Sequence, residues 1–352
     1  MIIRSSHAAF RLKLNQLHTQ IISNKCHDIL FNFGKKNNIR QYRKVNQAVK
    51  ILNRNVSNEK IHRYTSNIIG LYGALENFVE SLIDEVVDNL NMLIPNSDNL
   101  PEAIMKNYLC GSVDVIRKAE NAGKLQNVNK LDVVESLFKT LNQHSSSLMP
   151  ESFYNISGGN YKYEVICNCF VKMGFSNIAT QIPSIPPCST ILNKEYGDLY
   201  LNEPQSRLFG LIDDLVERRN DIAHGGMSIT IINDREFCKY LDFMDKFADS
   251  LCTYLRCEMA RLLWNNYRKP RLSISHIYSN NIIVVKTITE KFEKGGWIIC
   301  KYGGEDPSYC FRQILSIQVD DVEYEEYYCV ITTAVGLKLD NSVTNHTTFV
   351  VI

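Results

Sequence analysis

Residues 211–226 read LIDDLVERRNDIAHGG, which predicts an amphipathic helix that ends at two glycines. Its apolar residues recur at steps of three and four and form one stripe: Leu211, Ile212, Leu215, Val216, Ile222 and Ala223. Arg219 falls on that stripe. A guanidinium there must be paired or presented to a partner molecule, because an unpaired buried charge is very costly.

Two further polar residues of this helix, Asn220 and His224, lie one turn apart and are therefore neighbours. Arg219 and His224 are five residues apart, or about 140° around a regular helix. One helix therefore does not bring both side chains to one atom. A second copy of the helix across a twofold axis would complete such a site, which favours a homodimer.

The pair Arg219 and His224 suits cleavage of RNA by its own ribose 2′-hydroxyl. A histidine that titrates near neutrality can accept the hydroxyl proton or donate one to the leaving oxygen. An arginine can hold the phosphate as negative charge builds on its oxygens. The scheme requires no metal ion and no other cofactor.

The composition is that of a chain with a sizeable core: 352 residues, of which 45% are hydrophobic. This length favours two domains. We find neither a secretory signal nor an apolar run long enough to cross a bilayer. The 11 cysteines are scattered, which indicates reduced thiols and a cytoplasmic protein, and the spacing Cys167-x-Cys169 does not suit a zinc site.

Charge is distributed unevenly along the chain, although the formal net charge is only +1. Residues 1–65 hold 13 lysines and arginines against two carboxylates, whereas residues 271–352 hold seven against ten. A basic end suits a polyanion, and we take its densest part as a candidate RNA-binding surface: Lys35, Lys36, Arg40, Arg43 and Lys44. A solvated helix face explains the same residues equally well.

Helical patterns fill the chain up to Tyr267. We expect two helices within residues 5–54, a long one from about Tyr64 to Leu93, and others at 101–120, 129–145, 161–173, 205–224 and 234–267. Four prolines make 176–206 irregular. The long helix carries the clearest apolar stripe: Ile68, Leu71, Tyr72, Leu75, Phe78, Val79, Leu82, Ile83, Val86 and Val87.

The pattern changes after Pro270 to short β-rich runs, which predict a small antiparallel barrel or sandwich. The fold class is therefore mainly α, a helical bundle followed by a small all-β, barrel-like domain. We expect basic N-terminal helices at 1–60 that pack on or extend the bundle, the bundle itself at 61–268, and the β domain at 271–352.

Arg219-Asn220-Asp221-Ile222-Ala223-His224, between an amphipathic helix and Gly225-Gly226, resembles the Arg-polar-x-x-x-His motif of the HEPN superfamily. The segment 71–80, LYGALENFVE, resembles the paired helix of its RiboL-PSP-type branch. The resemblance covers roughly residues 60–265. It implies an HEPN helical bundle that dimerises to bring two motifs together.

Many members of this superfamily are metal-independent endoribonucleases in toxin, antiviral or RNA-processing systems. The resemblance therefore implies catalytic roles for Arg219 and His224, with Asn220 orienting them, and a setting in bacterial defence with an antitoxin or another partner protein. Glu76 matches an acidic residue often found on the neighbouring helix of the family. A solvated edge of Glu76, Glu80 and Asp84 is the alternative.

The C-terminal region, with Val335-Gly336-Leu337-Lys338-Leu339-Asp340 before a closing strand, resembles the second-domain barrel of translation GTPases. Such barrels often dock RNA, but the excess of acidic residues favours packing or partner binding at least as much. For the whole chain the competing interpretation is a non-catalytic module that binds RNA or a nucleotide, or a dimerising scaffold.

Overall fold

The computed structural model describes residues 3–37, 43–119, 125–156, 160–225, 230–266, 271–286, 290–303, 307–328, 334–344 and 347–351. By its internal contacts the chain divides into two compact units. The first unit comprises Met1–Asp88, Glu102–Leu137 and Leu148–Cys252, and the second comprises Asn89–Pro101, Phe138–Ser147 and Thr253–Ile352. The three domain ranges expected from the sequence stay a prediction.

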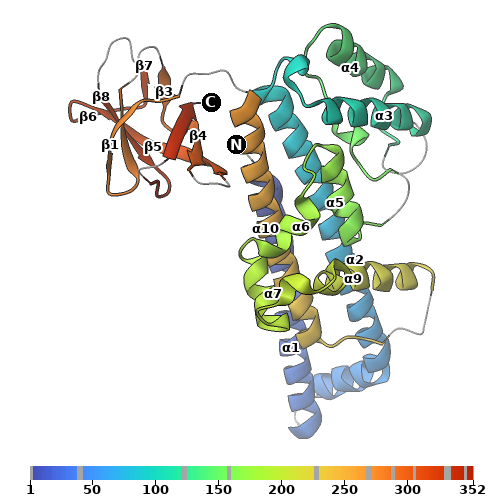
Figure 1. The fold of residues 1–352 in the computed structure, drawn as a ribbon. Coiled ribbons are helices and arrows are strands. Elements are labelled where there is room, and N and C mark those ends of the chain that lie inside the picture. Colours follow the sequence, from blue (N-terminus) through green and yellow to red (C-terminus); the bar gives the residue numbers. More distant parts are fainter. Residues whose placement is uncertain are drawn as a thin grey trace. The chain divides into compact units, whose positions relative to one another are not determined.

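Three long helices run through the α-helical part of the chain (Figure 1): α1 (Ser5–Asn37), α2 (Arg43–Leu93) and α10 (Asp234–Asn266). Shorter helices complete it: η1 (Ser97–Asn99), α3 (Glu102–Lys118), α4 (Lys130–Asn142), η2 (Pro150–Ser152), α5 (Tyr163–Lys172), α6 (Ile178–Gln181), η3 (Ile182–Ser184), α7 (Cys188–Tyr196), η4 (Tyr200–Asn202), α8 (Gln205–Leu208) and α9 (Gly210–Ala223). The segment 176–206, predicted to be irregular because of its prolines, therefore consists of short helical segments instead.

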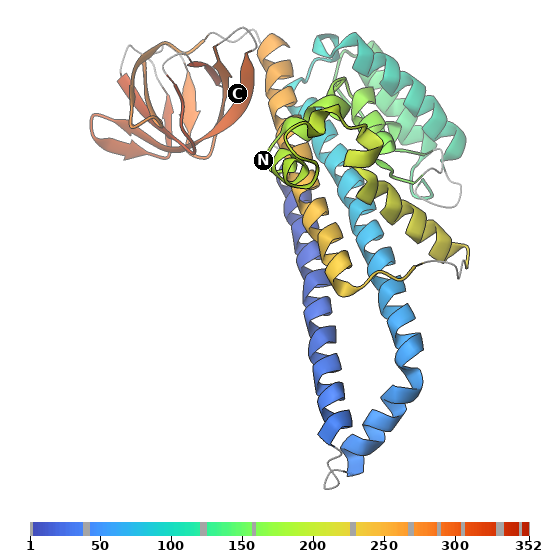
Figure 2. The same ribbon diagram turned by 60° about the horizontal axis from the view of Figure 1, so that its bottom comes forward.

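Helices α1 and α2 form an antiparallel hairpin (Figure 2). Phe10 stacks on Phe78 with ring centroids 4.6 Å apart, and further along the pair Arg63 donates to Asp28 over 3.1 Å. The predicted boundary before Tyr64 is wrong, because α2 is continuous from Arg43. Neither glycine nor proline occurs between Arg43 and Gly70, so nothing in that stretch ends the helix.

Every residue of the predicted apolar stripe of α2 is buried, which confirms the periodicity argument.

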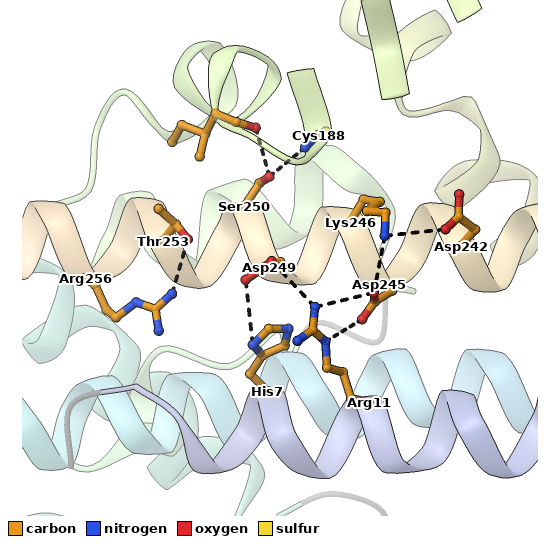
Figure 3. A network of polar contacts seen from close by, with 11 residues as sticks. His7, Arg11, Cys188, Asp242, Asp245, Lys246, Asp249, Ser250, Thr253 and Arg256 are labelled. Atoms are coloured by element: carbon orange, nitrogen blue, oxygen red, sulfur yellow. Dashed lines mark hydrogen bonds and ion pairs between the residues drawn. The ribbon is translucent and has the colours of Figure 1, made fainter. Parts of the chain in front are cut away.

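Helix α10 packs against α1 (Figure 3), and at this contact Arg11 of α1 bridges two carboxylates that lie one turn apart on α10. Its Nε lies 2.7 Å from Asp245 Oδ1, and its Nη2 lies 3.5 Å from Asp249 Oδ2. Because these groups are partly exposed, the ion pairs fix the register of the helices more than they stabilise them.

The helix predicted at 205–224 is broken at Phe209, which lies between α8 and α9. Its ring stacks on Tyr163 with centroids 3.8 Å apart and meets Phe243 and Phe247 edge-on. The backbone turns so that this ring reaches the core. Asp213 of α9 then accepts a hydrogen bond from the backbone N–H of Tyr163 over 3.0 Å, which caps α5. Helix α9 is therefore held at its start by aromatic packing.

Two helical glycines make a matched test of packing. A Cβ at Gly111 of α3 would lie 1.9 Å from the carbonyl oxygen of Ser152, whereas one at Gly73 of α2 would meet nothing within 4 Å. We expect Gly111→Ala to lower the free energy of unfolding by about 3 kcal/mol, and Gly73→Ala to raise it by up to about 1 kcal/mol. Urea denaturation measures both, and equal effects would contradict the close approach of α3 to Ser152.

The strands of the second unit are β1 (Ile274–Tyr278), β2 (Ile282–Lys286), β3 (Lys291–Glu293), β4 (Trp297–Tyr302), β5 (Ser308–Val319), β6 (Val322–Tyr324), β7 (Glu326–Tyr328), β8 (Ala334–Leu339) and β9 (Thr347–Val351). They form an antiparallel sheet in the order β1-β2-β8-β5-β4-β9, with β6 on β5, and a separate pair β3-β7. The N–H of Leu272, just before β1, donates to Phe349 of β9 over 2.9 Å. This bond joins the two ends of the sheet, so the predicted barrel-like β domain after a helical bundle is confirmed.

Candidate functional site

The end of α9 presents His224 to solvent. Gly225 has φ 72°, a left-handed conformation that glycine adopts without strain, and its N–H donates to the carbonyl of Ile222 over 3.2 Å. His224 is the C-cap residue, and its backbone N–H donates to Asn220 over 2.9 Å. Its side chain is exposed and makes no hydrogen bond within the part of the chain that the structure describes.

Arg219, five residues earlier, is half-buried and lies over the ring of Tyr72 in α2, with the guanidinium carbon 5.0 Å from the ring centroid. Its Nη1 donates to Asn220 Oδ1 over 3.2 Å and, more weakly, to Asn160 Oδ1 over 3.4 Å. Asn160 Nδ2 donates to Asn220 Oδ1 over 2.8 Å, and the Tyr72 hydroxyl donates to Asn160 Oδ1 over 3.2 Å. We call Tyr72, Asn160 and Asn220 the arginine cradle.

The arginine cradle offers amide oxygens and an aromatic face, but no carboxylate. Among the described residues no Asp or Glu oxygen lies within 4.0 Å of the Arg219 guanidinium. The cradle fixes the direction of the side chain through Nη1 and the ring. The positive charge of Arg219 therefore has no carboxylate partner within the ranges that the structure describes.

Arg218, the preceding residue, shows the opposite arrangement. Its Nε lies 2.6 Å from Asp214 Oδ2, and its Nη1 donates to the Tyr64 hydroxyl and to the carbonyl of Thr230. Burial lowers the pKa of Arg218, but the hydrogen bonds to Asp214 and Tyr64 outweigh it, and the pKa ends above its ordinary value. Arg218 is thus a structural arginine, whereas its neighbour Arg219 has no carboxylate partner in the part of the chain that the structure describes.

The predicted residue Glu76 is half-buried and lies between Tyr72 and Glu80 at four-residue steps of α2. Glu80 accepts a hydrogen bond from the Tyr161 hydroxyl over 3.0 Å. Burial and the charge of Glu80 raise the pKa of Tyr161, so this phenol stays neutral. Glu76 thus shares a helix face with one member of the arginine cradle, and its catalytic role stays a prediction.

Sequence reasoning missed two members of the cradle. The sequence predicts Tyr72 only as a member of the apolar stripe, and it is 3% exposed, yet its ring face also contacts Arg219 and its hydroxyl donates to Asn160. Asn160 was not singled out. It lies 88 residues from Tyr72 and 60 from Asn220 in the sequence, and local sequence patterns do not predict contacts between residues so far apart.

Arg219 and His224 are not joined by any contact within one chain, as far as the described residues show. The structure brings Asn220 to Arg219 rather than to the imidazole. Of the predicted RNA-binding residues, Arg40 lies outside the described residues, as do the side chains of Lys35, Lys36, Arg43 and Lys44. That surface stays a prediction.

No group of three or more His, Cys, Asp or Glu side chains in the described ranges could hold a metal ion. Metal independence stays a prediction about the reaction. None of the described helices is long and apolar enough to span a bilayer.

Fold and site together define an HEPN-type helical domain, with its Arg-Asn-x-x-x-His segment at the end of one helix. The family model RiboL-PSP-HEPN matches residues 36–256, more than half of the chain, and the chain belongs to this family. Membership indicates an RNA-related, ribonuclease-like function. The β domain follows the matched region. No curated protein matches the sequence closely enough to count as a relative.

Proposed function

We propose that this chain is an endoribonuclease that cleaves RNA by attack of a ribose 2′-hydroxyl on the adjacent phosphate, without a metal ion. The observation that carries the proposal is that Arg219 lies on a cradle of amides and an aromatic ring and has no carboxylate partner among the described residues. A neutral cradle holds the Arg219 guanidinium in a position where a phosphate can bind to it, whereas a carboxylate partner would compete with the phosphate.

His224 supplies the proton transfer in this scheme. The imidazole accepts the 2′-hydroxyl proton, or donates a proton to the leaving 5′-oxygen, and the products are a 2′,3′-cyclic phosphate and a 5′-hydroxyl. Its exposed position at the end of α9 leaves it open to a bound RNA. Arg219 stabilises the extra charge on the non-bridging oxygens as the 2′-oxygen attacks.

The site is completed in a homodimer. Arg219 and His224 project from the same helix about 140° apart. Within a single chain the two side chains therefore do not point at the same RNA phosphate. A twofold axis near α9 brings Arg219 of one protomer toward the partner's His224. The proposed setting is a bacterial toxin or antiviral effector whose activity a partner protein controls.

Cleavage in the presence of EDTA tests the proposed reaction. Purified protein is incubated with structured and unstructured RNA, and the product ends are analysed for cyclic phosphate. We expect cleavage to persist in EDTA and to fall by at least about a hundredfold in His224→Ala and in Arg219→Ala. The matched controls are the exposed residues His276 and Arg117, whose alanine variants should cleave like the wild type.

Two results would count against the proposal. Cleavage unchanged in both site variants would assign the activity elsewhere. RNA binding without cleavage would instead favour the non-catalytic module, for which simultaneous replacement of Lys35, Lys36, Arg40, Arg43 and Lys44 abolishes binding while His224→Ala has no effect.

A further inference from the structure

Two cysteines of the second unit lie directly opposite one another on neighbouring strands. Cys300 of β4 pairs with Cys310 of β5 in the antiparallel ladder. Residues paired in this way project their side chains from the same face of the sheet. Their Cα atoms lie about 4.5 or 5.5 Å apart, depending on the hydrogen bonds of the pair, and both separations fall within the range of about 4.4–6.8 Å that disulfides span. The two thiols, which are free in this structure, can therefore be joined without a change of strand register.

The two cysteines differ in their surroundings. Cys300 is fully buried in the core of the β domain, whereas Cys310 is half-buried and packs against that core. The Cys310 thiol donates to the hydroxyl of Tyr302 over 3.7 Å, and this hydroxyl can turn to donate to the sulfur once the thiol proton is lost. Cys310 is thus the residue of the pair that a small solute reaches first.

Arg312 lies two residues after Cys310 on β5 and therefore on the same face of the sheet. Its Nη2 donates to the Tyr302 hydroxyl over 2.9 Å, and its Nη1 donates to the carbonyl of Phe311 over 3.2 Å. Its Nε is buried and has no hydrogen-bond partner in the described part of the chain, and no carboxylate there lies within 4.0 Å of the guanidinium. A half-buried cation without a carboxylate stabilises a neighbouring thiolate.

The groups around the pair make Cys310 the more acidic thiol. The hydrogen bond from Cys300 and the charge of Arg312 lower the pKa of Cys310, and with the neighbouring phenol they outweigh burial and the opposing charge of Asp340. Burial raises the pKa of Cys300. It also raises the pKa of Cys257, which lies nearby on α10, to about 11. Of these three thiols, Cys310 therefore carries the most thiolate near neutral pH.

We propose that Cys310 and Cys300 are a peroxide-reactive pair that closes a reversible disulfide between β4 and β5. The Cys310 thiolate attacks one oxygen of hydrogen peroxide, so that the O–O bond breaks, an S–O bond forms and hydroxide leaves. The Cys300 sulfur then attacks the sulfenic acid of Cys310, an S–S bond forms, and the displaced oxygen leaves as water with the Cys300 proton. The two thiols lose two electrons and the peroxide gains them.

Reduction of the disulfide requires an external dithiol, which attacks one of the two sulfurs and is itself oxidised. The reaction uses neither Arg219 nor His224. It is therefore a modification of the β domain that is independent of RNA cleavage.

Peptide mapping of the full-length chain after peroxide treatment tests the proposal. Trypsin cuts after Lys294, Lys301 and Arg312, so the two cysteines fall on separate peptides that only a disulfide joins. The protein is treated with hydrogen peroxide at neutral pH, blocked with N-ethylmaleimide, digested without reductant and analysed by mass spectrometry. We expect the joined peptides to form at least about tenfold faster than the exposed thiols of Cys26 and Cys110 are oxidised, and to separate in dithiothreitol.

Single variants assign the role of each residue. In Cys300→Ala, oxidation of Cys310 should stop at the sulfenic acid, which dimedone labels, whereas in Cys310→Ala dimedone should leave Cys300 unlabelled. The matched control Cys257→Ala should close the disulfide at the wild-type rate. Thermal unfolding shows whether each variant is folded.

Arg312 has a test of its own, because a purely structural arginine would not change the acidity of a thiol. Arg312→Met should slow the oxidation of Cys310 at least about tenfold and raise the pH midpoint of its alkylation by iodoacetamide. Arg312→Lys keeps the positive charge and should recover most of the rate. Equal midpoints in wild type and Arg312→Met would remove Arg312 from the proposal.

Three results would overturn the proposed pair. They are a disulfide from Cys310 to Cys257, oxidation of Cys310 to a sulfinic acid without any disulfide, and reaction of Cys310 no faster than that of Cys26 and Cys110. Mapping of the wild-type chain needs no substitution, so an unstable variant leaves the main test intact. Because the readout is the bond itself, the result does not depend on whether the chain cleaves RNA.

Discussion

Mixing the Arg219→Ala and His224→Ala variants should restore RNA cleavage that neither variant shows alone. In a mixed dimer, Arg219 comes from the His224→Ala chain and His224 from the Arg219→Ala chain, so one of the two sites is intact. Random pairing yields half mixed dimers, and we therefore expect about a quarter of the wild-type rate. Co-expression with two different affinity tags isolates the mixed dimer and measures its rate directly.

The control pairs each single variant with an Arg219→Ala/His224→Ala double variant. Those mixed dimers contain no complete pair and should stay inactive. An active Arg219→Ala and His224→Ala mixture beside inactive controls requires that the site spans two protomers. An inactive mixture whose mixed dimers do form would refute the proposed division of roles between protomers.

Helix periodicity predicted most of the bundle because it reflects burial directly. The α2 stripe illustrates this, since each of its residues from Ile68 to Val87 is buried. The same reasoning misplaced the start of α2, because the residues before Tyr64 have weaker periodicity but contain nothing that ends a helix. It also missed the break at Phe209, which depends on a stack with Tyr163 that is distant in the sequence.

The candidate site likewise contains residues that the sequence predicts and residues that it does not. Arg219, Asn220 and His224 could be identified because they lie within six residues of one helix, where spacing fixes their relative directions. The partners of Arg219 could not, because Tyr72 and Asn160 reach it only through the packing of α2 and the residues before α5 against α9. The family motif therefore identifies the catalytic candidates, and the fold shows that, among the described residues, Arg218 is paired with a carboxylate whereas Arg219 meets amides and an aromatic ring.

Because the cradle of Arg219 is neutral, adding a carboxylate to it should strongly slow RNA cleavage. Asn160→Asp changes no shape but places a carboxylate where Arg219 Nη1 now meets an amide oxygen. The Asn220 amide can turn over to donate to the new carboxylate. We expect RNA cleavage to fall about a hundredfold, because the new ion pair competes with the phosphate for Arg219. The thermal midpoint should stay the same or rise, since the half-buried charge gains a partner.

Two variants separate neutralisation of Arg219 from loss of its anchor. Asn160→Ala removes the anchor without adding charge, and it should slow cleavage only about tenfold because Asn220 and the Tyr72 ring still hold the guanidinium. Asn193→Asp adds the same charge on the exposed surface of α7 and should leave the rate unchanged. If Asn160→Asp cleaved as fast as Asn160→Ala, the absence of a carboxylate beside Arg219 would have no catalytic meaning. A larger loss in Asn160→Asp alone would show that the free charge of Arg219 acts on the phosphate.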